Sequence, residues 1–240
     1  PPDETAIRDL IGRIAGPDAA KAVSFSTIAT TDWVKKSLEG LKPVEAGRFV
    51  VHGAHDRHQI AAHRIGIEIE AALAFGTGHH GTTRGCLLAL DAIAKQRAPR
   101  RILDIGTGSG VLAIAAARRL RRNVLASDID QQAVIAARDN ARRNAAAPFI
   151  QTIRATGLSA GAFRRNAPFD LIFANILLAP LMRMSAPAAR LLAPGGRIVL
   201  SGLLPAHAAA ALSAYRAQGL ALERRIELED WMTLVMRRPG

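Results

Sequence analysis

The second half of the chain alternates short apolar runs with longer segments of helical periodicity. Apolar runs typical of buried strands occupy residues 101–105, 123–127, 149–153, 169–174 and 196–200. Helical patterns occupy residues 111–120, 131–144, 179–192 and 205–218, and the stretch between 153 and 169 has no regular pattern. Strands separated by helices predict a mostly parallel sheet with right-handed crossovers and helices on both faces.

The end of the chain departs from this alternation. Two further strand patterns, 221–228 and 231–236, are separated only by Glu229 and Asp230. Two residues are too few for a helical crossover, so these strands should form an antiparallel hairpin. The expected fold is therefore α/β and Rossmann-like, with a mostly parallel seven-stranded sheet and an antiparallel C-terminal hairpin, which is typical of class I methyltransferases.

The first 94 residues contain shorter elements. Asp3 can cap a helix that ends at Gly16, and residues 23–28 alternate as a strand does. Thr31 or Asp32 begins a short helix that Gly40 ends. The patterns at 48–51 and 65–69 predict two strands, and the pattern at 82–94 predicts a helix.

A glycine-rich turn follows the strand at 101–105. It reads DIGTGSG, with Gly106, Gly108 and Gly110 between the strand and the helix that begins at Val111. Glycines let the backbone turn sharply and approach a ligand, and the first amides of the helix point into the same space. A dinucleotide fingerprint would need its third glycine at position 111, so this loop is of another kind.

An acidic residue ends the next predicted strand. Asp128 comes 22 residues after Gly106, where a carboxylate can accept hydrogen bonds from both hydroxyls of a ribose. Ile129 follows it, so no basic residue stands there to bind the 2′-phosphate of NADP. A ribose and an adenine without a pyrophosphate describe S-adenosylmethionine, which is the expected cofactor.

Composition limits the class of protein. The chain has 240 residues, a net charge of +12 and a single cysteine, Cys86, so it forms no internal disulfide. It shows neither a signal peptide nor a membrane-spanning run, and we expect a cytoplasmic enzyme, monomeric because nothing indicates an obligate partner. Only five of the 32 basic residues are lysines, the arginines are scattered in pairs, and aromatic residues are few. Sequence-specific nucleic-acid binding is therefore not expected.

Five segments resemble one family closely. Residues 73–86 (LAFGTGHHGTTRGC), 102–117 (ILDIGTGSGVLAIAAA), 127–144 (SDIDQQAVIAARDNARRN), 169–181 (FDLIFANILLAPL) and 191–204 (LLAPGGRIVLSGLL) are similar to the ribosomal protein L11 methyltransferases. The resemblance covers residues 32–240. It implies methyl transfer from S-adenosylmethionine to lysine and N-terminal amines of a large-subunit ribosomal protein, and it allows an indirect contact with the ribosome.

The resemblance also implies site residues. Thr83, Gly106, Asp128 and Asn175 match the donor-binding positions of the family, and Asn175 is the candidate catalytic residue. Asn175 follows a strand at the edge where open α/β sheets bind ligands. The remaining predicted cofactor contacts are Gly108, Gly110, Ile129, Phe75 and Thr77.

The residues after Asn175 bear on the acceptor. Methyltransferases that modify planar amides or base amines tend to carry an aromatic residue here, whereas this chain continues with Ile176, Leu177 and Leu178. A flexible aliphatic amine is therefore the expected acceptor. Three alternatives remain open: a methyltransferase for another protein or small-molecule amine, a non-catalytic cofactor-binding ribosome-assembly module, and an NAD-dependent oxidoreductase.

The resemblance divides the chain into three parts. Residues 1–30 would be a remnant of an N-terminal substrate-recognition domain, 31–45 a linker helix, and 46–240 the methyltransferase domain. His79 and Gly81 stand where the family commonly has Thr and Pro, and His80 holds the family's His position. No metal is expected, and a polar surface loop accounts for the remaining histidines of this region, which are His52, His55, His58 and His63.

Overall fold

The computed structural model describes residues 3–25, 43–69 and 80–240. The chain divides into two compact units, residues 1–40 and 41–240. The predicted short helix after Thr31 and most of the linker segment lie outside the described residues.

The first unit contains two helices, α1 (Glu4–Ala15) and α2 (Pro17–Ala22). The Asp3 carboxylate caps α1 by accepting hydrogen bonds from the amides of Thr5 and Ala6 at 3.1 and 3.0 Å, as the sequence predicts. The sequence analysis missed α2, which begins at Pro17 because proline suits the first helical position. Residues 23–25 follow α2 without strand structure, so the predicted strand at 23–28 is wrong there, and 26–28 lie outside the described residues.

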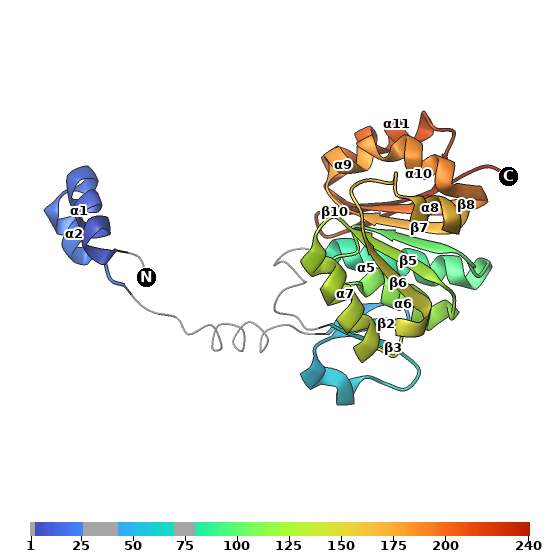
Figure 1. The fold of residues 1–240 in the computed structure, drawn as a ribbon, viewed down its shortest axis with the longest axis horizontal. Coiled ribbons are helices and arrows are strands. Elements are labelled where there is room, and N and C mark those ends of the chain that lie inside the picture. The colour runs from blue at the N-terminus through green and yellow to red at the C-terminus, as the bar shows by residue number, and fades with distance from the viewer. Residues whose placement is uncertain (1–2, 26–42, 70–79) are drawn as a thin grey trace. The chain divides into compact units, whose positions relative to one another are not determined.

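The second unit is built on a seven-stranded sheet with the strand order β6-β5-β4-β7-β8-β10-β9 (Figure 1). Strand β10 runs antiparallel to both of its neighbours, whereas β4 through β8 are parallel to one another. The predicted parallel sheet with a C-terminal hairpin is therefore confirmed. The strands are β4 (Ile102–Ile105), β5 (Val124–Asp128), β6 (Ile150–Arg154), β7 (Phe169–Asn175), β8 (Leu192–Leu203), β9 (Ala221–Leu228) and β10 (Trp231–Arg237).

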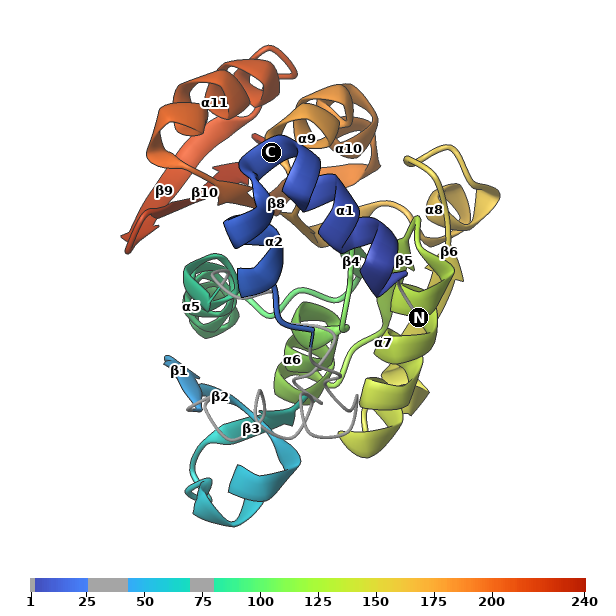
Figure 2. The same ribbon diagram turned by 90° about the vertical axis from the view of Figure 1, so that its left-hand side faces the viewer.

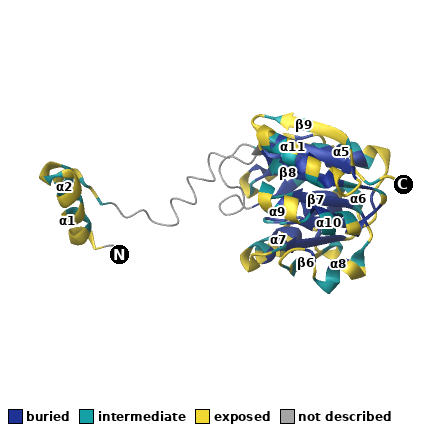
Figure 3. Cartoon of the chain, turned by 90° about the horizontal axis from the view of Figure 1, so that it is seen from above, coloured by how far each residue is buried: buried dark blue, intermediate teal, exposed yellow. Residues whose placement is uncertain are grey.

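Alternation along the strands divides the apolar side chains between two cores. In β4, Ile102 packs into one core, whereas Leu103 and Ile105 pack into the other. Both faces of the sheet are covered by helices (Figure 2). The central strands β4, β5, β7, β8 and β10 are mostly buried, whereas the edge strands β6 and β9 contain no buried residue (Figure 3). One face carries α5 (His80–Gln96), α6 (Val111–Leu120) and α7 (Gln131–Arg143), and the other carries α8 (Gly161–Asn166), α9 (Leu178–Arg183), α10 (Ser185–Leu191) and α11 (Ala208–Arg216).

Three elements on the second face differ from the sequence prediction. Helix α8 lies within the stretch expected to be irregular, and a 3-10 turn, η3 (Pro205–His207), precedes α11. The helix expected at 179–192 is two helices that meet at Met184. The break places Pro187 in the first turn of α10, where its missing N–H breaks no helical hydrogen bond.

A second, three-stranded sheet completes the unit. It consists of β1 (Val44–Ala46), β2 (Phe49–His52) and β3 (Ile65–Glu68), with β2 antiparallel to β1 and parallel to β3. Asn144 ties this sheet to the end of α7, since its side chain accepts from the Glu68 amide at 2.8 Å and donates to the Glu68 carbonyl at 2.7 Å. Residues 44 and 45 lie in β1, so the predicted linker helix is wrong at its last two positions. In the parts of the chain that the structure describes, no helix has the length and apolar character to cross a membrane.

Candidate functional site

The loop between β4 and α6 has a backbone that only glycine adopts without strain. Gly106, Gly108 and Gly110 have φ angles of 66°, 53° and 82°. A Cβ atom at Gly106 would lie 2.4 Å from Cγ2 of Ile176, and one at Gly110 would lie 3.1 Å from the Cα atom of Ala137. A Cβ atom at Gly108 would meet nothing within 4 Å. The loop thus approaches its neighbours closely at two glycines and is open at the third.

This difference predicts unequal costs for two alanine substitutions. Gly108→Ala should lower the free energy of unfolding by about 1 kcal/mol, because it adds only the strain of a left-handed alanine. Gly106→Ala adds the contact with Ile176 and should cost about 2–4 kcal/mol. Urea unfolding of the two variants measures the difference, and equal losses would show that Ile176 gives way freely.

Asp104 is buried beneath this loop. Its Oδ2 atom accepts hydrogen bonds from the Thr107 hydroxyl at 2.7 Å and from the Ala113 amide at 3.2 Å. These bonds join the end of β4 to the loop and to the first turn of α6. Burial raises the pKa of the Asp104 carboxyl to about 6, although both hydrogen bonds favour the charged form.

The raised pKa makes stability depend on pH. Between about pH 4 and pH 6 the unfolded chain loses this proton before the folded chain does, so the free energy of unfolding falls as pH rises. We expect Asp104 to account for about 3 kcal/mol of this decrease in the free energy of unfolding. The Asp104→Asn variant should lack that part of the decrease. Denaturant unfolding at intervals from pH 4 to pH 7 tests this. Asp139→Asn, which changes an exposed carboxylate on α7, is the control and should keep the wild-type slope.

Asp128 ends β5 with its carboxylate held in place. Its Oδ2 atom accepts from the Gly108 amide at 2.9 Å, and its Oδ1 atom accepts from the Asp130 amide at 3.0 Å. Each oxygen keeps a further lone pair for a ligand. The next residue, Ile129, leaves 61% of its surface exposed although it is a large apolar side chain.

Asp128, Ile129 and Gly106 line one cavity of about 1050 Å³ at the carboxyl ends of the parallel strands. This is the edge of an open α/β sheet at which ligands bind. The loop that follows β6 contributes residues that the sequence analysis missed, although its place after a parallel strand could have indicated them. The additional lining residues at this edge include Ser127, Ala155, Thr156, Leu158 and Ile176.

Asn175 ends β7 and is half-buried; it does not itself line this cavity, whereas the next residue, Ile176, does. Its Nδ2 atom donates to the Thr82 hydroxyl on α5 at 3.3 Å. The Ser201 hydroxyl donates to the Thr82 carbonyl at 3.1 Å and lies 2.8 Å from the Thr233 hydroxyl. Thr82 engages one N–H of the Asn175 amide, which orients the side chain, and the Oδ1 atom is the acceptor that this side chain can offer to a ligand.

The other residues predicted to contact the cofactor either do not line this cavity or lie outside the described residues. Thr83 is buried on α5 and does not line the cavity of about 1050 Å³, and Gly108 and Gly110 shape the loop without lining it. Phe75, Thr77 and His79 lie outside the described residues. The structure therefore brings Gly106, Asp128 and Ile129 together at one cavity, and ligand contacts at all of the predicted positions stay predictions.

The histidine segment is partly a surface loop. His55, His58 and His63 are exposed, and a 3-10 turn, η1 (Ala54–Gln59), forms its centre. His52 differs from the prediction because it ends β2 and is buried, with its Nδ1 atom 2.8 Å from the Gly53 carbonyl. Within residues 3–25, 43–69 and 80–240, no three His, Cys, Asp or Glu side chains gather as metal ligands.

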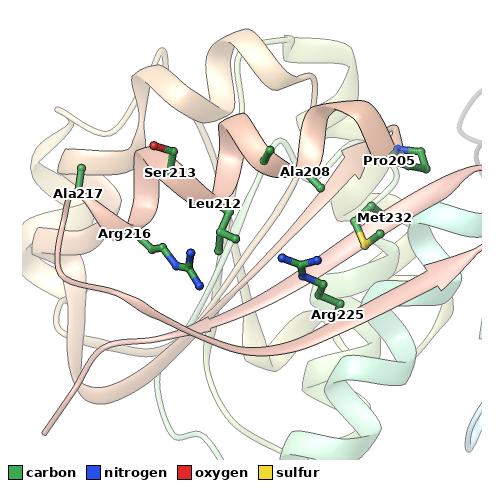
Figure 4. Close-up of a pocket in the computed structure, with 9 residues that line it drawn as sticks. Pro205, Ala208, Leu212, Ser213, Arg216, Ala217, Arg225 and Met232 are labelled. Atoms are coloured by element: carbon green, nitrogen blue, oxygen red, sulfur yellow. The ribbon is translucent and has the colours of Figure 1, made fainter.

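A second cavity of about 590 Å³ lies between α11 and the β9–β10 hairpin and contains no predicted site residue. Arg216 and Arg225 extend into it from opposite sides, with Leu212 between them (Figure 4). This second cavity shares no lining residue with the cavity at Asp128.

Comparison with known proteins identifies the family. A family model described as ribosomal protein L11 methyltransferase (PrmA) matches residues 2–239. The chain belongs to this family. The protein is therefore a methyltransferase, and the alternative of an NAD-dependent oxidoreductase is excluded.

Individual relatives agree with the family model. The chain is 54% identical over 239 residues to the ribosomal protein L11 methyltransferase of Bradyrhizobium diazoefficiens, covering 100% of this chain and 81% of that protein. It is 52% identical over 237 residues to that of Rhodopseudomonas palustris, covering 99% and 80%. The crystal structure of the ribosomal protein L11 methylase from Lactobacillus delbrueckii subsp. bulgaricus aligns with a TM-score of 0.71 at 26% identity, covering 83% of this chain and 100% of that one.

Proposed function

We propose that this methyltransferase moves methyl groups from S-adenosylmethionine to lysine or N-terminal amines of a large-subunit ribosomal protein. The observation that carries the proposal is the fixed Asp128 carboxylate, which faces the same cavity as Gly106 in a member of this family. The side chains at the cavity suit both the donor and the amine.

The donor site follows from the chemistry of three residues. The free lone pairs of Asp128 suit the two ribose hydroxyls, and the exposed Ile129 side chain offers an apolar surface for the adenine. Gly106 carries no side chain between the loop and the cavity. When bound, S-adenosylmethionine would supply a methyl group: the lone pair of a neutral amine would attack the methyl carbon in line with its bond to sulfur, S-adenosylhomocysteine would leave, and the methylated amine would then lose a proton to water.

The acceptor site is centred on Asn175. Because Thr82 holds the Nδ2 atom, the Oδ1 atom can accept an N–H of the amine and direct its lone pair toward the methyl group. Ile176 lines the cavity, and Leu177, which is 74% exposed, extends the aliphatic surface. These side chains suit the stem of a lysine, and no ring stands at these positions to stack on a planar amide.

The main free-energy cost is deprotonation of the amine. For a lysine with a reference pKa of about 10.4, the neutral form near pH 7.5 costs on the order of 4 kcal/mol, and for an α-amine near pKa 8 it costs under about 1 kcal/mol. Desolvation beside the cationic sulfonium lowers the amine pKa. We therefore propose catalysis by positioning, without an obligatory general base.

The proposal gives the first unit a part in substrate recognition. No residue of α1 is buried, and Leu10 and Ile14 are 51% and 77% exposed, which leaves an apolar face available. Residues 1–30 would then belong to a recognition domain, 31–45 to a linker, and 46–240 to the methyltransferase domain. The proposed enzyme is a cytoplasmic monomer that binds its ribosomal protein without a membrane and without reading a nucleic-acid sequence.

Intact-mass spectrometry of purified ribosomal protein L11, incubated with the enzyme and donor, tests the proposal. The expected result is a set of mass increments of one methyl group each, which disappear when the amines of the substrate are acetylated beforehand. Donor binding without any transfer would indicate a non-catalytic module. Transfer only to other proteins or to small amines would contradict the ribosomal substrate and leave the donor site intact.

A further inference from the structure

A basic cleft lies at the amino ends of the parallel strands, on the edge of the sheet opposite the cavity at Asp128. It has a volume of about 580 Å³ and is lined by the residues at which β4, β5, β6 and β7 begin. The five residues of β5 separate the two edges by roughly 16 Å at about 3.3 Å per residue. A ligand in this cleft therefore does not occupy the methyl-transfer site.

Five arginines from three segments line the cleft. Arg100 and Arg101 precede β4, Arg121 and Arg122 follow α6, and Arg165 belongs to α8. All five are exposed, and none forms an ion pair with another described residue. This arrangement concentrates positive charge that the described part of the chain leaves without compensation.

One acidic residue, Asp170, directly follows the lining residue Phe169, but its carboxylate already accepts hydrogen bonds from the backbone. Asp170 accepts the backbone amides of Arg100 and Arg101 through Oδ2 at 2.8 and 3.0 Å, and it does not line the cleft. Among the described residues that do line it there is no Asp or Glu. The cleft therefore selects for an anion with several charges.

The remaining exposed lining is polar apart from Pro148. Asn123, Gln151 and Asn166 add amide groups, whereas Phe169 is buried and Phe149 is half-buried. Without an exposed aromatic ring, the described lining of the cleft offers no platform on which a base could stack. It also lacks the apolar anchors that dominate protein–protein interfaces, which argues against an acidic protein as the occupant.

We propose that this cleft binds the phosphate backbone of RNA without reading its sequence. Guanidinium groups match phosphate oxygens in paired hydrogen bonds, and contacts of this kind position a protein on nucleic acid without selecting bases. The choice of RNA over DNA rests on the proposed function, because a ribosomal substrate is met beside RNA. The enzyme can then hold RNA at one edge of its sheet and an amine at the other.

Fluorescence anisotropy with a short labelled RNA of mixed sequence tests the cleft directly. The test variant carries Arg100→Gln, Arg122→Gln and Arg165→Gln, and leaves out Arg101, which donates to the Ala167 carbonyl, and Arg121, whose φ is 51°. The matched control carries Arg216→Gln, Arg224→Gln and Arg225→Gln. These three arginines are also exposed and unpaired in the described structure, and they lie on α11 and β9.

The expected result is a loss of about tenfold in RNA affinity for the test variant at moderate salt. The slope of log affinity against log salt should fall by about 2, at roughly 0.7 for each of three lost phosphate contacts. The control should keep the wild-type affinity and slope. A third variant with Lys at positions 100, 122 and 165 keeps the charge and should retain most of the slope, and thermal unfolding should show that all variants fold.

Three outcomes would overturn the proposal. Equal losses in the test and control variants would mean that net charge alone attracts RNA. Polyglutamate that competes as well as unlabelled RNA would indicate an acidic protein partner, and tighter binding of DNA of the same sequence would contradict the choice of RNA. Methylation of free ribosomal protein should be unchanged in the test variant, so failure at the cleft is distinguishable from failure of the proposed activity.

Discussion

Asp128→Ala should weaken the binding of S-adenosylmethionine about a hundredfold or more. The variant removes the acceptor that we propose for the two ribose hydroxyls, and hydrogen bonds to a charged group contribute about 1.5–3 kcal/mol each. The carboxylate is also fixed by the Gly108 and Asp130 amides, so no rearrangement is needed before the ligand binds. Isothermal titration calorimetry with the donor measures the dissociation constant.

Asp130→Asn is the matched control for this variant. It removes one negative charge two residues away, and asparagine still caps α7, where the Asp130 side chain accepts from the Gln132 amide at 2.9 Å. Its donor affinity should equal that of the wild type. An unchanged affinity in a folded Asp128→Ala protein would remove the basis of the donor site.

Asn175→Ala should lower the rate of methyl transfer about a hundredfold while the affinity for the donor stays unchanged. The variant removes the Oδ1 acceptor that we propose orients the amine, and a misplacement of about 1 Å at a reacting centre costs on the order of a hundredfold in rate. Single-turnover kinetics at saturating donor, with calorimetry on the same protein, separate the rate from binding. Full turnover with normal donor binding would contradict the role of Asn175.

A substitution of Thr82, the hydrogen-bond partner of Asn175, should have a smaller effect on the rate of methyl transfer than Asn175→Ala. Thr82→Val removes the hydroxyl that holds Nδ2 and keeps the shape of the side chain, so it should slow transfer in the same direction by a smaller factor. The rates of the wild type and of both variants should rise with pH as the amine deprotonates, because positioning does not require a titrating base. A pH profile that loses its dependence in Asn175→Ala would indicate a general base coupled to this residue.

The sequence predicted most strands because their signal is local. In β4 the apolar run Ile102, Leu103 and Ile105 predicts a buried strand before any partner strand is known, and the structure divides these side chains between the two cores. The two-residue turn at Glu229 and Asp230 likewise required a hairpin. Helix ends were less predictable, since the break at Met184 depends on how Pro187 is accommodated and on the helices packed beside it.

In the candidate site, too, some features could be predicted from the sequence and others depend on contacts between distant segments. The glycine loop and Asp128 could be predicted because each lies at the end of its own strand. The two strands, β4 and β5, are parallel neighbours, so their carboxyl ends lie side by side. His52 was misplaced because its burial depends on the pairing of β2 with β3. The hydrogen bonds from Asn175 to Thr82 and from Ser201 to Thr82 join residues separated by 93 and 119 positions, and no sequence pattern records them.

By itself, the sequence determined the α/β class, the C-terminal hairpin, the glycine loop and the carboxylate at the end of β5, because these follow from local backbone preferences and side-chain periodicity. Only the tertiary structure decided that β10 inserts between β8 and β9, that Thr82 holds the Asn175 amide, and that five arginines from three segments share one cleft. The physical reason is that these features depend on non-local contacts, whose free energy is gained only when distant segments pack together.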